Sequence, residues 1–140
     1  MKKKVAHLLS AFTVVGFLFL AFGSDDEKTT ENAIVNEQPD IEVSAQQLYA
    51  DYEANGVAAD QRYKGKVLRV TGYVNNIDRD IMDKIYVTLK GDQYIGDIQC
   101  FFAEGHANTA AQLQKGQQIT VKGKCDGKLM NVLLKGCVIE

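Results

Sequence analysis

A period of two between apolar and polar positions dominates the chain from residue 66 onwards. The first such stretch, 66–77, is rich in β-branched residues and predicts a long strand. Its central Gly72 predicts a bulge or a sharp bend, because a glycine inside a strand usually marks one of the two. Further apolar or alternating segments predict four more strands, at 85–89, 97–102, 118–125 and 129–139.

Two segments carry helical signals instead. Residues 44–47, Ser-Ala-Gln-Gln, predict a capping box, in which the Ser44 hydroxyl accepts a hydrogen bond from the Gln47 amide and the Gln47 side chain returns to the Ser44 amide. Because apolar residues follow it at helical spacing, the box predicts a helix over 45–55, which Gly56 ends in a left-handed conformation. An alanine-rich segment over 104–116 predicts a second, shorter helix that ends on a glycine.

These elements follow one another in a recognisable order. Polar loops at 78–84 and 91–96 separate the first three strands, and Asp126-Gly127 predicts a turn between the last two. Five short strands with a helix between the third and fourth are the order of the OB-fold. The sequence therefore predicts a mainly β protein, a five-stranded OB-fold barrel (β-β-β-α-β-β) preceded by an N-terminal helix.

The first 23 residues have the pattern of an export signal. Lysines at 2–4 precede an apolar stretch from Leu8 to Phe22, and the small residues after it predict cleavage after Gly23. The alternative is an uncleaved anchor through residues 5–22, since that stretch reaches the lower limit of about 17 residues for a membrane span. Both interpretations carry the rest of the chain across the membrane. We expect an exported protein, periplasmic or extracellular, or one held at the inner membrane by this segment.

An acidic segment separates this signal from the strands. Residues 24–43 hold seven acidic side chains, one lysine and the only proline of the chain. Such a composition buries too little apolar surface to offset the entropy lost on ordering. The sequence therefore predicts an acidic, disordered linker over 24–43 and a folded domain over 44–140.

Composition and charge narrow the class of protein. The chain has 140 residues, of which 46% are hydrophobic and 24% charged, so one domain fits and a two-domain enzyme is excluded. Without the three lysines of the signal, 13 basic residues stand against 18 acidic ones, a net charge of −5. The chain therefore has no long-range attraction for polyanions.

Several short segments carry a resemblance to a known family. They are Tyr52-Glu53-Ala54-Asn55, Tyr63-Lys64-Gly65-Lys66-Val67, Val70-Thr71-Gly72, Ile98-Gln99-Cys100-Phe101, Lys115-Gly116-Gln117, Thr120-Val121-Lys122-Gly123-Lys124-Cys125 and Asn131-Val132-Leu133-Leu134. Together they resemble the bacterial family called tRNA_anti-like over essentially all of 44–140. The resemblance implies an OB domain and an exported protein, and it implies no particular activity. The cysteine that would accept a lipid after the apolar stretch is missing here, which departs from the lipidated members.

The chain offers few groups for catalysis or metal binding. His106 is the only histidine outside the signal, and no Gly-x-Ser-x-Gly or similar motif surrounds it, so we interpret it as a helix-surface residue. Three separated cysteines do not match the spacing of a zinc site. Residues 78–83 hold three aspartates but lack the glycine and the terminal glutamate of a calcium loop. We expect a non-enzymatic protein with no cofactor and no metal.

The three cysteines predict one disulfide. An oxidising compartment favours a bond, and the third and fifth strands are neighbours in the OB-fold. The pair predicted is therefore Cys100 with Cys137, which leaves Cys125 free. The alternative is three buried free thiols, since cysteine also behaves as a small hydrophobic residue.

A ligand face is expected on the second and third strands, where OB domains bind. Tyr86, Tyr94 and Phe101 are its candidate aromatics, the last because it shares a strand face with Gln99. The same aromatics could instead be the surface that the helix over 45–55 covers. The three aspartates of the first loop would repel phosphates, which favours an unknown protein or glycan partner in the envelope over nucleic acid. We expect a binding or structural module of the bacterial cell envelope, with an oligonucleotide-binding OB domain as the alternative.

Overall fold

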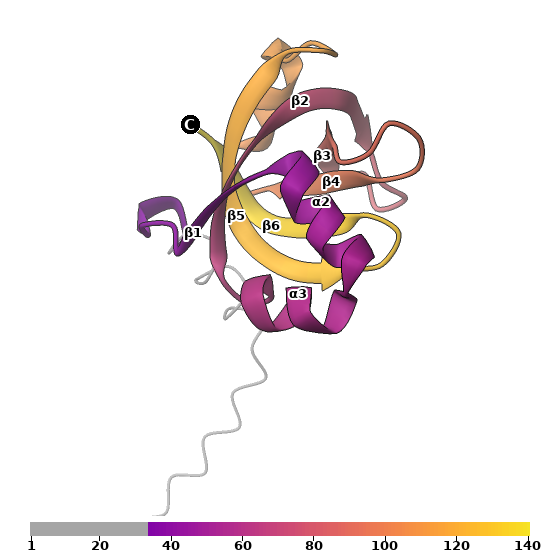
Figure 1. Cartoon of the computed structure of the whole chain (residues 1–140). Coiled ribbons are helices and arrows are strands. Elements are labelled where there is room, and N and C mark those ends of the chain that lie inside the picture. The colour runs from indigo at the N-terminus through magenta and orange to yellow at the C-terminus, as the bar shows by residue number, and fades with distance from the viewer. Residues whose placement is uncertain (1–33) are drawn as a thin grey trace, which may run out of the picture.

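The computed structural model describes residues 34–140, and the predicted signal and residues 24–33 of the predicted linker lie outside this part of the chain. Figure 1 shows a small barrel with helices at its ends. The elements are β1 (Ile41–Ser44), α2 (Ala45–Ala54), α3 (Gly56–Tyr63), β2 (Val67–Arg79), β3 (Ile85–Lys90), β4 (Asp97–Phe102), the 3-10 helix η1 (Ala107–Gln112), β5 (Gln118–Lys128) and β6 (Val132–Ile139).

Five of the strands close a barrel. The sheet order is β1-β2-β3-β4-β6-β5, and β2 also pairs with β5, which joins the two ends of the barrel. Neighbours in the barrel are antiparallel except β4 and β6, which run parallel. Alternate residues of each strand point inwards and form one core, so that Val70, Val87 and Leu134 are fully buried. The predicted mainly β class and five-stranded OB-fold barrel are confirmed.

The sixth strand, β1, was not predicted. It pairs in parallel with β2 from Ile41 opposite Leu68 to Ser44 opposite Thr71. Ile41 and Val43 pack against the core, while Glu42 and Ser44 are exposed. The period-two pattern was present in the sequence but was hidden by the acidic composition around it.

The predicted disordered linker is corrected for residues 34–43. Ile34 is only 3% exposed, although seven acids surround it in the sequence. The buried ammonium of Lys122 holds the segment, because Nζ donates hydrogen bonds of 2.9 Å to the carbonyl oxygens of Val35 and Glu37. Side-chain contacts from a distant strand thus order a segment whose own composition does not.

The predicted helix over 45–55 is present as α2, and the Ser44 half of its capping box is confirmed by a 3.1 Å hydrogen bond from the Gln47 amide to Ser44 Oγ. The side-chain amide of Gln47 donates to Asp51 Oδ1 at 2.7 Å. Gly56 does not end it in a left-handed conformation. Asn55 ends α2 instead, and its side chain accepts from the Ala58 amide to begin α3. Figure 1 shows the two helices meeting at a corner, with α2 across one end of the barrel.

Gly72 has a different role from the bulge that its position predicted. The register of β2 shifts between Val74 and Asn76 rather than at Gly72. A Cβ at Gly72 would lie 2.7 Å from the Cβ of Ala45 at the start of α2. The glycine therefore allows the helix to approach the strand closely.

Two other local predictions are corrected. The turn expected at Asp126-Gly127 lies inside β5, where Gly127 has a φ of +86° and the pairing with β6 shifts register. The reversal comes at 129–131, where the Leu129 amide donates to the Asn131 carbonyl. The helix expected over 104–116 is only the 3-10 helix η1.

No helix within residues 34–140 has the length and apolar character that a membrane crossing requires.

Candidate ligand groove

Tyr86 and Phe101 form an aromatic pair on the outer wall of the barrel. They are direct partners across β3 and β4, and their ring centroids lie 5.7 Å apart in an edge-to-face arrangement with an interplanar angle of 60°. The residues next to them on the strands, Val87 and Cys100, point into the core, so the pair points outwards and is half-buried. The two rings lie on the face of the barrel where OB domains bind ligands.

Tyr94 is not part of this wall. It lies in the loop 91–96 between β3 and β4, and it is 85% exposed. The loop reverses through hydrogen bonds from the amides of Gly91 and Asp92 to the Gly96 carbonyl, which directs its tip away from the strands. The structure thus brings together two of the three aromatics that the sequence singled out.

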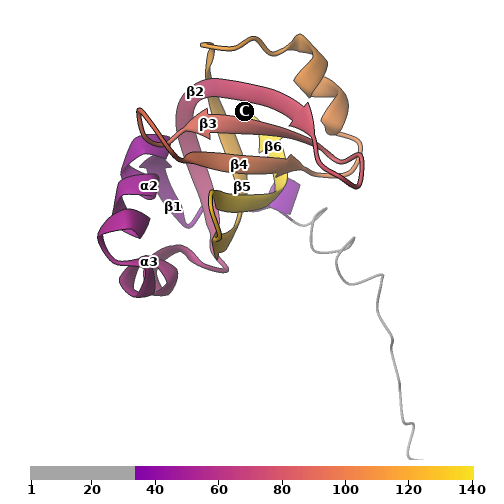
Figure 2. The same ribbon diagram turned by 90° about the vertical axis from the view of Figure 1, so that its right-hand side faces the viewer.

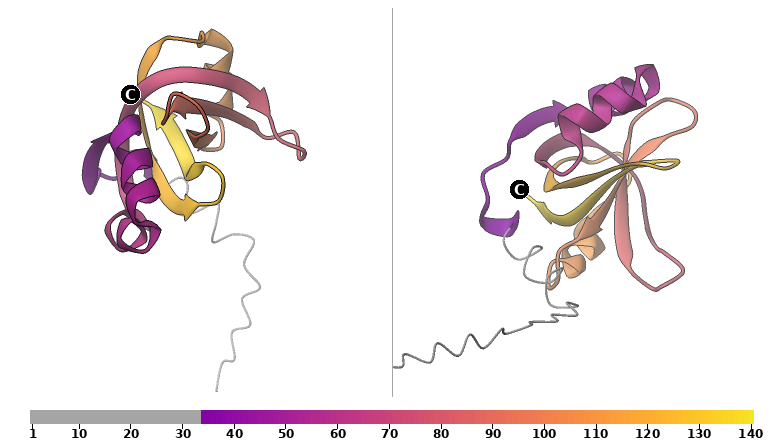
Figure 3. Two further views of the ribbon diagram at one scale, coloured as in Figure 1. Left: turned by 45° about the vertical axis from the view of Figure 1, so that its right-hand side comes forward. Right: turned by 90° about the horizontal axis from the view of Figure 1, so that it is seen from below.

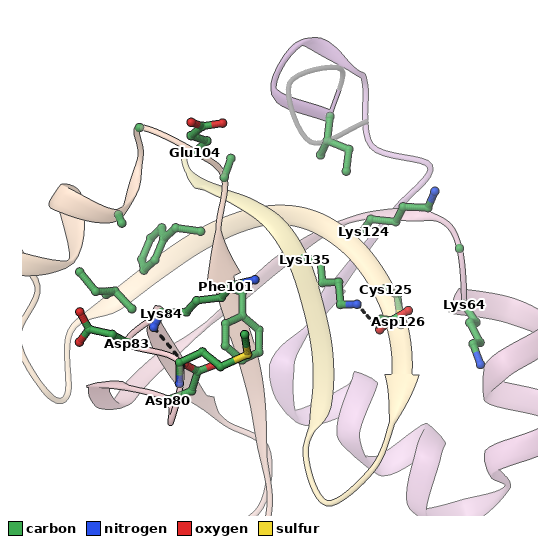
Figure 4. Close-up of a pocket in the computed structure, with 18 residues that line it drawn as sticks. Lys64, Asp80, Asp83, Lys84, Phe101, Glu104, Lys124, Cys125, Asp126 and Lys135 are labelled. Atoms are coloured by element: carbon green, nitrogen blue, oxygen red, sulfur yellow. Dashed lines mark hydrogen bonds and ion pairs between the residues drawn. The ribbon is translucent and has the colours of Figure 1, made fainter. Parts of the chain in front are cut away.

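A groove of about 850 Å³ begins at Phe101 and continues over the outer surface of β6 and β5. Figure 4 shows it between the hairpin loop that carries Asp80 and Asp83 and the strand that carries Asp126. Its apolar lining comes from both the wall and that loop, and includes Met82, Ile85, Phe101, Phe102 and Ala103. Ile34 borders it from the N-terminal segment.

Charges of both signs surround the groove in equal number. Its charged lining consists of Lys64, Lys84, Lys124 and Lys135 with Asp80, Asp83, Glu104 and Asp126. Lys135 Nζ and Asp126 Oδ2 form an ion pair of 2.8 Å across β6 and β5, which Figure 4 shows at one side of the groove. The groove therefore has an apolar floor and a rim of charged side chains whose formal net charge is zero.

The aspartates of the loop between β2 and β3 shape the loop. Asp80 Oδ1 accepts from the amides of Met82 and Lys84, at 2.8 and 2.9 Å. Asp83 has a positive φ of 64° and forms an ion pair with Arg79.

Within residues 34–140, no group of three histidine, cysteine or acidic side chains is placed to hold a metal ion.

Cys125 borders the groove as a buried thiol. Its Sγ lies 3.5 Å from the Tyr52 hydroxyl, which also donates a 3.0 Å hydrogen bond to Asp60. Burial raises the pKa of the Cys125 thiol, with smaller opposing contributions from the hydrogen bonds of Tyr52 and of the Gly127 backbone. The thiol therefore stays protonated at neutral pH, which does not suit a nucleophile.

The predicted disulfide is absent, and all three cysteines are buried free thiols, as in the alternative interpretation. The register of β4 and β6 explains the correction. Cys100 lies opposite Leu134 and Phe102 lies opposite Cys137, so the two cysteines are offset by two residues along β4 and by three along β6. With about 3.3 Å per residue and 4.8 Å between strands, their Cα atoms lie about 8 Å apart, beyond the span of a disulfide.

His106 lies half-buried immediately before η1. Its carbonyl oxygen accepts from the amide and the hydroxyl of Thr109, at 3.2 and 2.7 Å. His106 was expected on the surface of a helix, and the structure places it at the start of one.

The sequence did not predict the far side of the groove. Lys64, Asp126 and Lys135 come from three separate segments that meet only when β5 pairs with β6 and with the start of β2. A sequence signal existed for Lys135, which follows the buried Leu134 in the last strand and so points to the outer surface.

The closed five-stranded barrel, its capping helix and the aromatic wall define an OB-type protein. The chain belongs to the tRNA_anti-like family, whose profile matches residues 1–138.

Among solved structures, the chain is similar to a crystal structure from Klebsiella pneumoniae subsp. pneumoniae, described as a "putative nucleic acid-binding lipoprotein". The TM-score is 0.56 at 19% sequence identity, and the match covers 78% of this chain and 96% of that chain. At this identity the likeness concerns the fold. No curated protein sequence matches the chain.

Proposed function

We propose that this protein is a non-enzymatic binding module of the bacterial cell envelope, whose groove holds a segment of a partner protein or a glycan. The groove itself carries the proposal. Phe101 and Met82 offer apolar surface to a ligand, while the four lysines and four acids around them offer hydrogen bonds without a net charge. Protein segments and sugars combine apolar and polar groups in this way, whereas a polyphosphate backbone needs a positive groove.

The envelope part of the proposal rests on the N-terminal sequence. The three lysines and the apolar stretch from Leu8 to Phe22 have the pattern of an export signal. The similar structure from Klebsiella is described as a lipoprotein, which agrees with an envelope location for the fold. The raised pKa of Cys125, which borders the groove, keeps this thiol protonated and supports a binding role.

Oligonucleotide binding is the second candidate function. The Tyr86–Phe101 pair favours it, because aromatic rings on the strands of an OB wall stack with bases. The description of the Klebsiella protein as nucleic acid-binding points the same way. Asp80 and Asp83 oppose it, since both lie in the loop that would meet the phosphates.

A photoreactive residue at position 101 tests the main proposal in intact cells. We expect a discrete adduct with an envelope protein or glycan at this position. The matched control is the same residue at Val57, which is 71% exposed in α3 and outside the groove lining. Equal adducts from both positions would contradict the proposal.

Fluorescence anisotropy with a mixed-sequence single-stranded 20-mer separates the two candidates. Each phosphate contact contributes about −0.7 to the slope of log affinity against log salt. We expect no binding at physiological salt. Micromolar affinity that persists there and disappears in Phe101→Ala would make oligonucleotide binding the better conclusion.

A further inference from the structure

Large apolar side chains are exposed mainly at the tips of three hairpin loops. Within residues 34–140, six of the eight exposed large hydrophobic residues form three sequence-adjacent pairs: Ile81 and Met82, Tyr94 and Ile95, and Leu129 and Met130. Their exposed fractions lie between 73% and 104%. Each pair lies in a connection between two barrel strands, 80–84, 91–96 and 129–131, and we call the six residues the loop-tip cluster.

The three loops project on one side of the barrel. Loops 91–96 and 129–131 lie at the same end of the wall, because they precede β4 and β6, which pair in parallel from Ile98 opposite Val132. Loop 80–84 lies at the other end of β3. Figure 1 and the right panel of Figure 3 share their horizontal axis, and in both the three loops reach furthest towards the right. Figure 2 looks onto this side and shows β3 and β4 running between the loops.

The base of loop 91–96 is fixed. The ring of Tyr49 in α2 lies directly against Gly91 and Gly96, the first and last residues of the loop, and leaves no room for a Cβ on either. Lys128 Nζ lies over the same ring, 5.0 Å from its centroid. The tip carrying Tyr94 therefore stands on a packed base.

The other two loops are held as firmly. Asn131 accepts from the Asp97 amide at 3.1 Å and donates to Gln99 Oε1 at 3.3 Å, which ties loop 129–131 to β4. Asp80 holds loop 80–84 through two backbone amides. These contacts hold the apolar tips in exposed positions, and no other residue of the described chain covers them.

A flat apolar medium fits this arrangement better than a protein surface does. The tips stand at separate points around the wall, whereas a protein interface has a continuous apolar centre with a polar rim. Paired aliphatic residues with a tyrosine among them match the side chains that enter the boundary between headgroups and acyl chains. The charged residues next to the tips carry both signs: Asp80 and Asp83 lie beside Lys84, and Asp92 lies between Lys90 and Tyr94.

We propose that the loop-tip cluster docks this face of the barrel onto a lipid bilayer, with all three tips entering the headgroup boundary. This contact shares Met82 with the groove, whose other lining residues lie outside the loop-tip cluster. It is distinct from the apolar N-terminal segment, because it uses side chains of the folded domain. Since the six side chains of the loop-tip cluster are uncharged, their insertion requires no anionic lipid and does not weaken with salt.

The chain contains no tryptophan, so a single introduced one reports on its own position. Tyr94→Trp is placed in the complete chain, which is reconstituted with phosphatidylcholine vesicles with and without bromine on the acyl chains. We expect a shorter emission wavelength than in lipid-free buffer and loss of most of the emission in the brominated vesicles. The matched control is Val57→Trp, which carries the same N-terminal segment and should show neither change.

A second variant tests whether the loops act together. Leu129→Asp with Met130→Asp, added to Tyr94→Trp, places two charges in the neighbouring loop and should restore most of the emission in brominated vesicles. Both residues are 82% exposed, so circular dichroism should show an unchanged fold. Equal emission from positions 94 and 57 in brominated vesicles would overturn the proposal, as would quenching at 94 that is unaffected by the two aspartates.

Discussion

The hydroxyl of Tyr63 in α3 donates a hydrogen bond of 2.5 Å to Oδ2 of Asp51 in α2. The bond joins the two helices at their corner, and Tyr63 is fully buried beneath it. Burial first, and the hydrogen bond second, raise the pKa of Tyr63 to about 12. The same hydroxyl is the main reason why the pKa of Asp51 lies below its ordinary value of 3.8.

Tyr63→Phe should therefore lower stability and flatten its pH dependence. The lowered pKa of Asp51 stabilises the fold above about pH 4, and this contribution is lost as the pH falls through the folded-state pKa. The raised pKa of Tyr63 stabilises the fold below pH 10.0, and this contribution is lost as the pH rises through about 12. We expect a loss of about 1–2 kcal/mol at pH 7, measured by urea unfolding.

The same unfolding curves at acid and alkaline pH complete this test. Tyr63→Phe should lose less stability than the natural chain when the pH is taken to 3 or to 11, because the variant lacks the Tyr63 hydroxyl and with it the main cause of the lowered pKa of Asp51. Tyr73→Phe is the control, since Tyr73 is 49% exposed and should leave both curves unchanged. Parallel pH profiles of Tyr63→Phe and the natural chain would show that the pair does not act in this way.

Gly96→Ala should destabilise the loop that carries Tyr94. A Cβ at this position would overlap the ring of Tyr49, which projects from α2 against the loop. We expect a loss of about 1–3 kcal/mol from overpacking, measured as a lower denaturant midpoint.

The matched control for this substitution is Gly56→Ala. Gly56 begins α3 and has no neighbouring atom within 4 Å of an added Cβ, so alanine should be neutral or slightly stabilising. Similar midpoints for the two alanine variants would contradict the packing of Tyr49 on the loop.

Lys122→Met should release the segment that precedes β1. The ammonium of Lys122 donates to the carbonyls of Val35 and Glu37, and it lies 3.6 Å from Glu140. Methionine fills the same space without these bonds, so hydrogen exchange at residues 34–40 should become faster while the barrel amides stay protected.

Lys115→Met is the control for Lys122→Met, because Lys115 is exposed and lies in the connection before β5. It should leave exchange at residues 34–40 unchanged. Equal exchange in both variants would mean that β1 alone holds the segment.

All three cysteines should be recovered as free thiols that react only after unfolding. Cys100 and Cys137 are completely buried, and Cys125 is 2% exposed. Non-reducing peptide mapping after alkylation in denaturant should find three modified thiols, and native alkylation should find none. A peptide joining Cys100 to Cys137 would contradict the strand register described above.

The five barrel strands, the N-cap hydrogen bond at Ser44 and the outward direction of Phe101 could be predicted from the sequence. Each depends on residues close together in the chain: a period of two, a side chain that reaches an amide three residues on, and the face shared with Gln99. The same local signals predicted the OB order, because the barrel joins its strands largely in sequence.

What depends on distant residues was decided only by the tertiary structure. The order of residues 34–43 comes from the pairing of β1 with β2 and from the buried ammonium of Lys122, more than eighty positions away, which together outweigh the acidic composition of the segment. The neutral groove exists because the pairing of β5 with β6 brings Asp126 and Lys135 opposite Phe101. The failed pairing of Cys100 with Cys137 has the same cause, since a parallel pair of strands can slide by two residues without any change in the pattern of either strand.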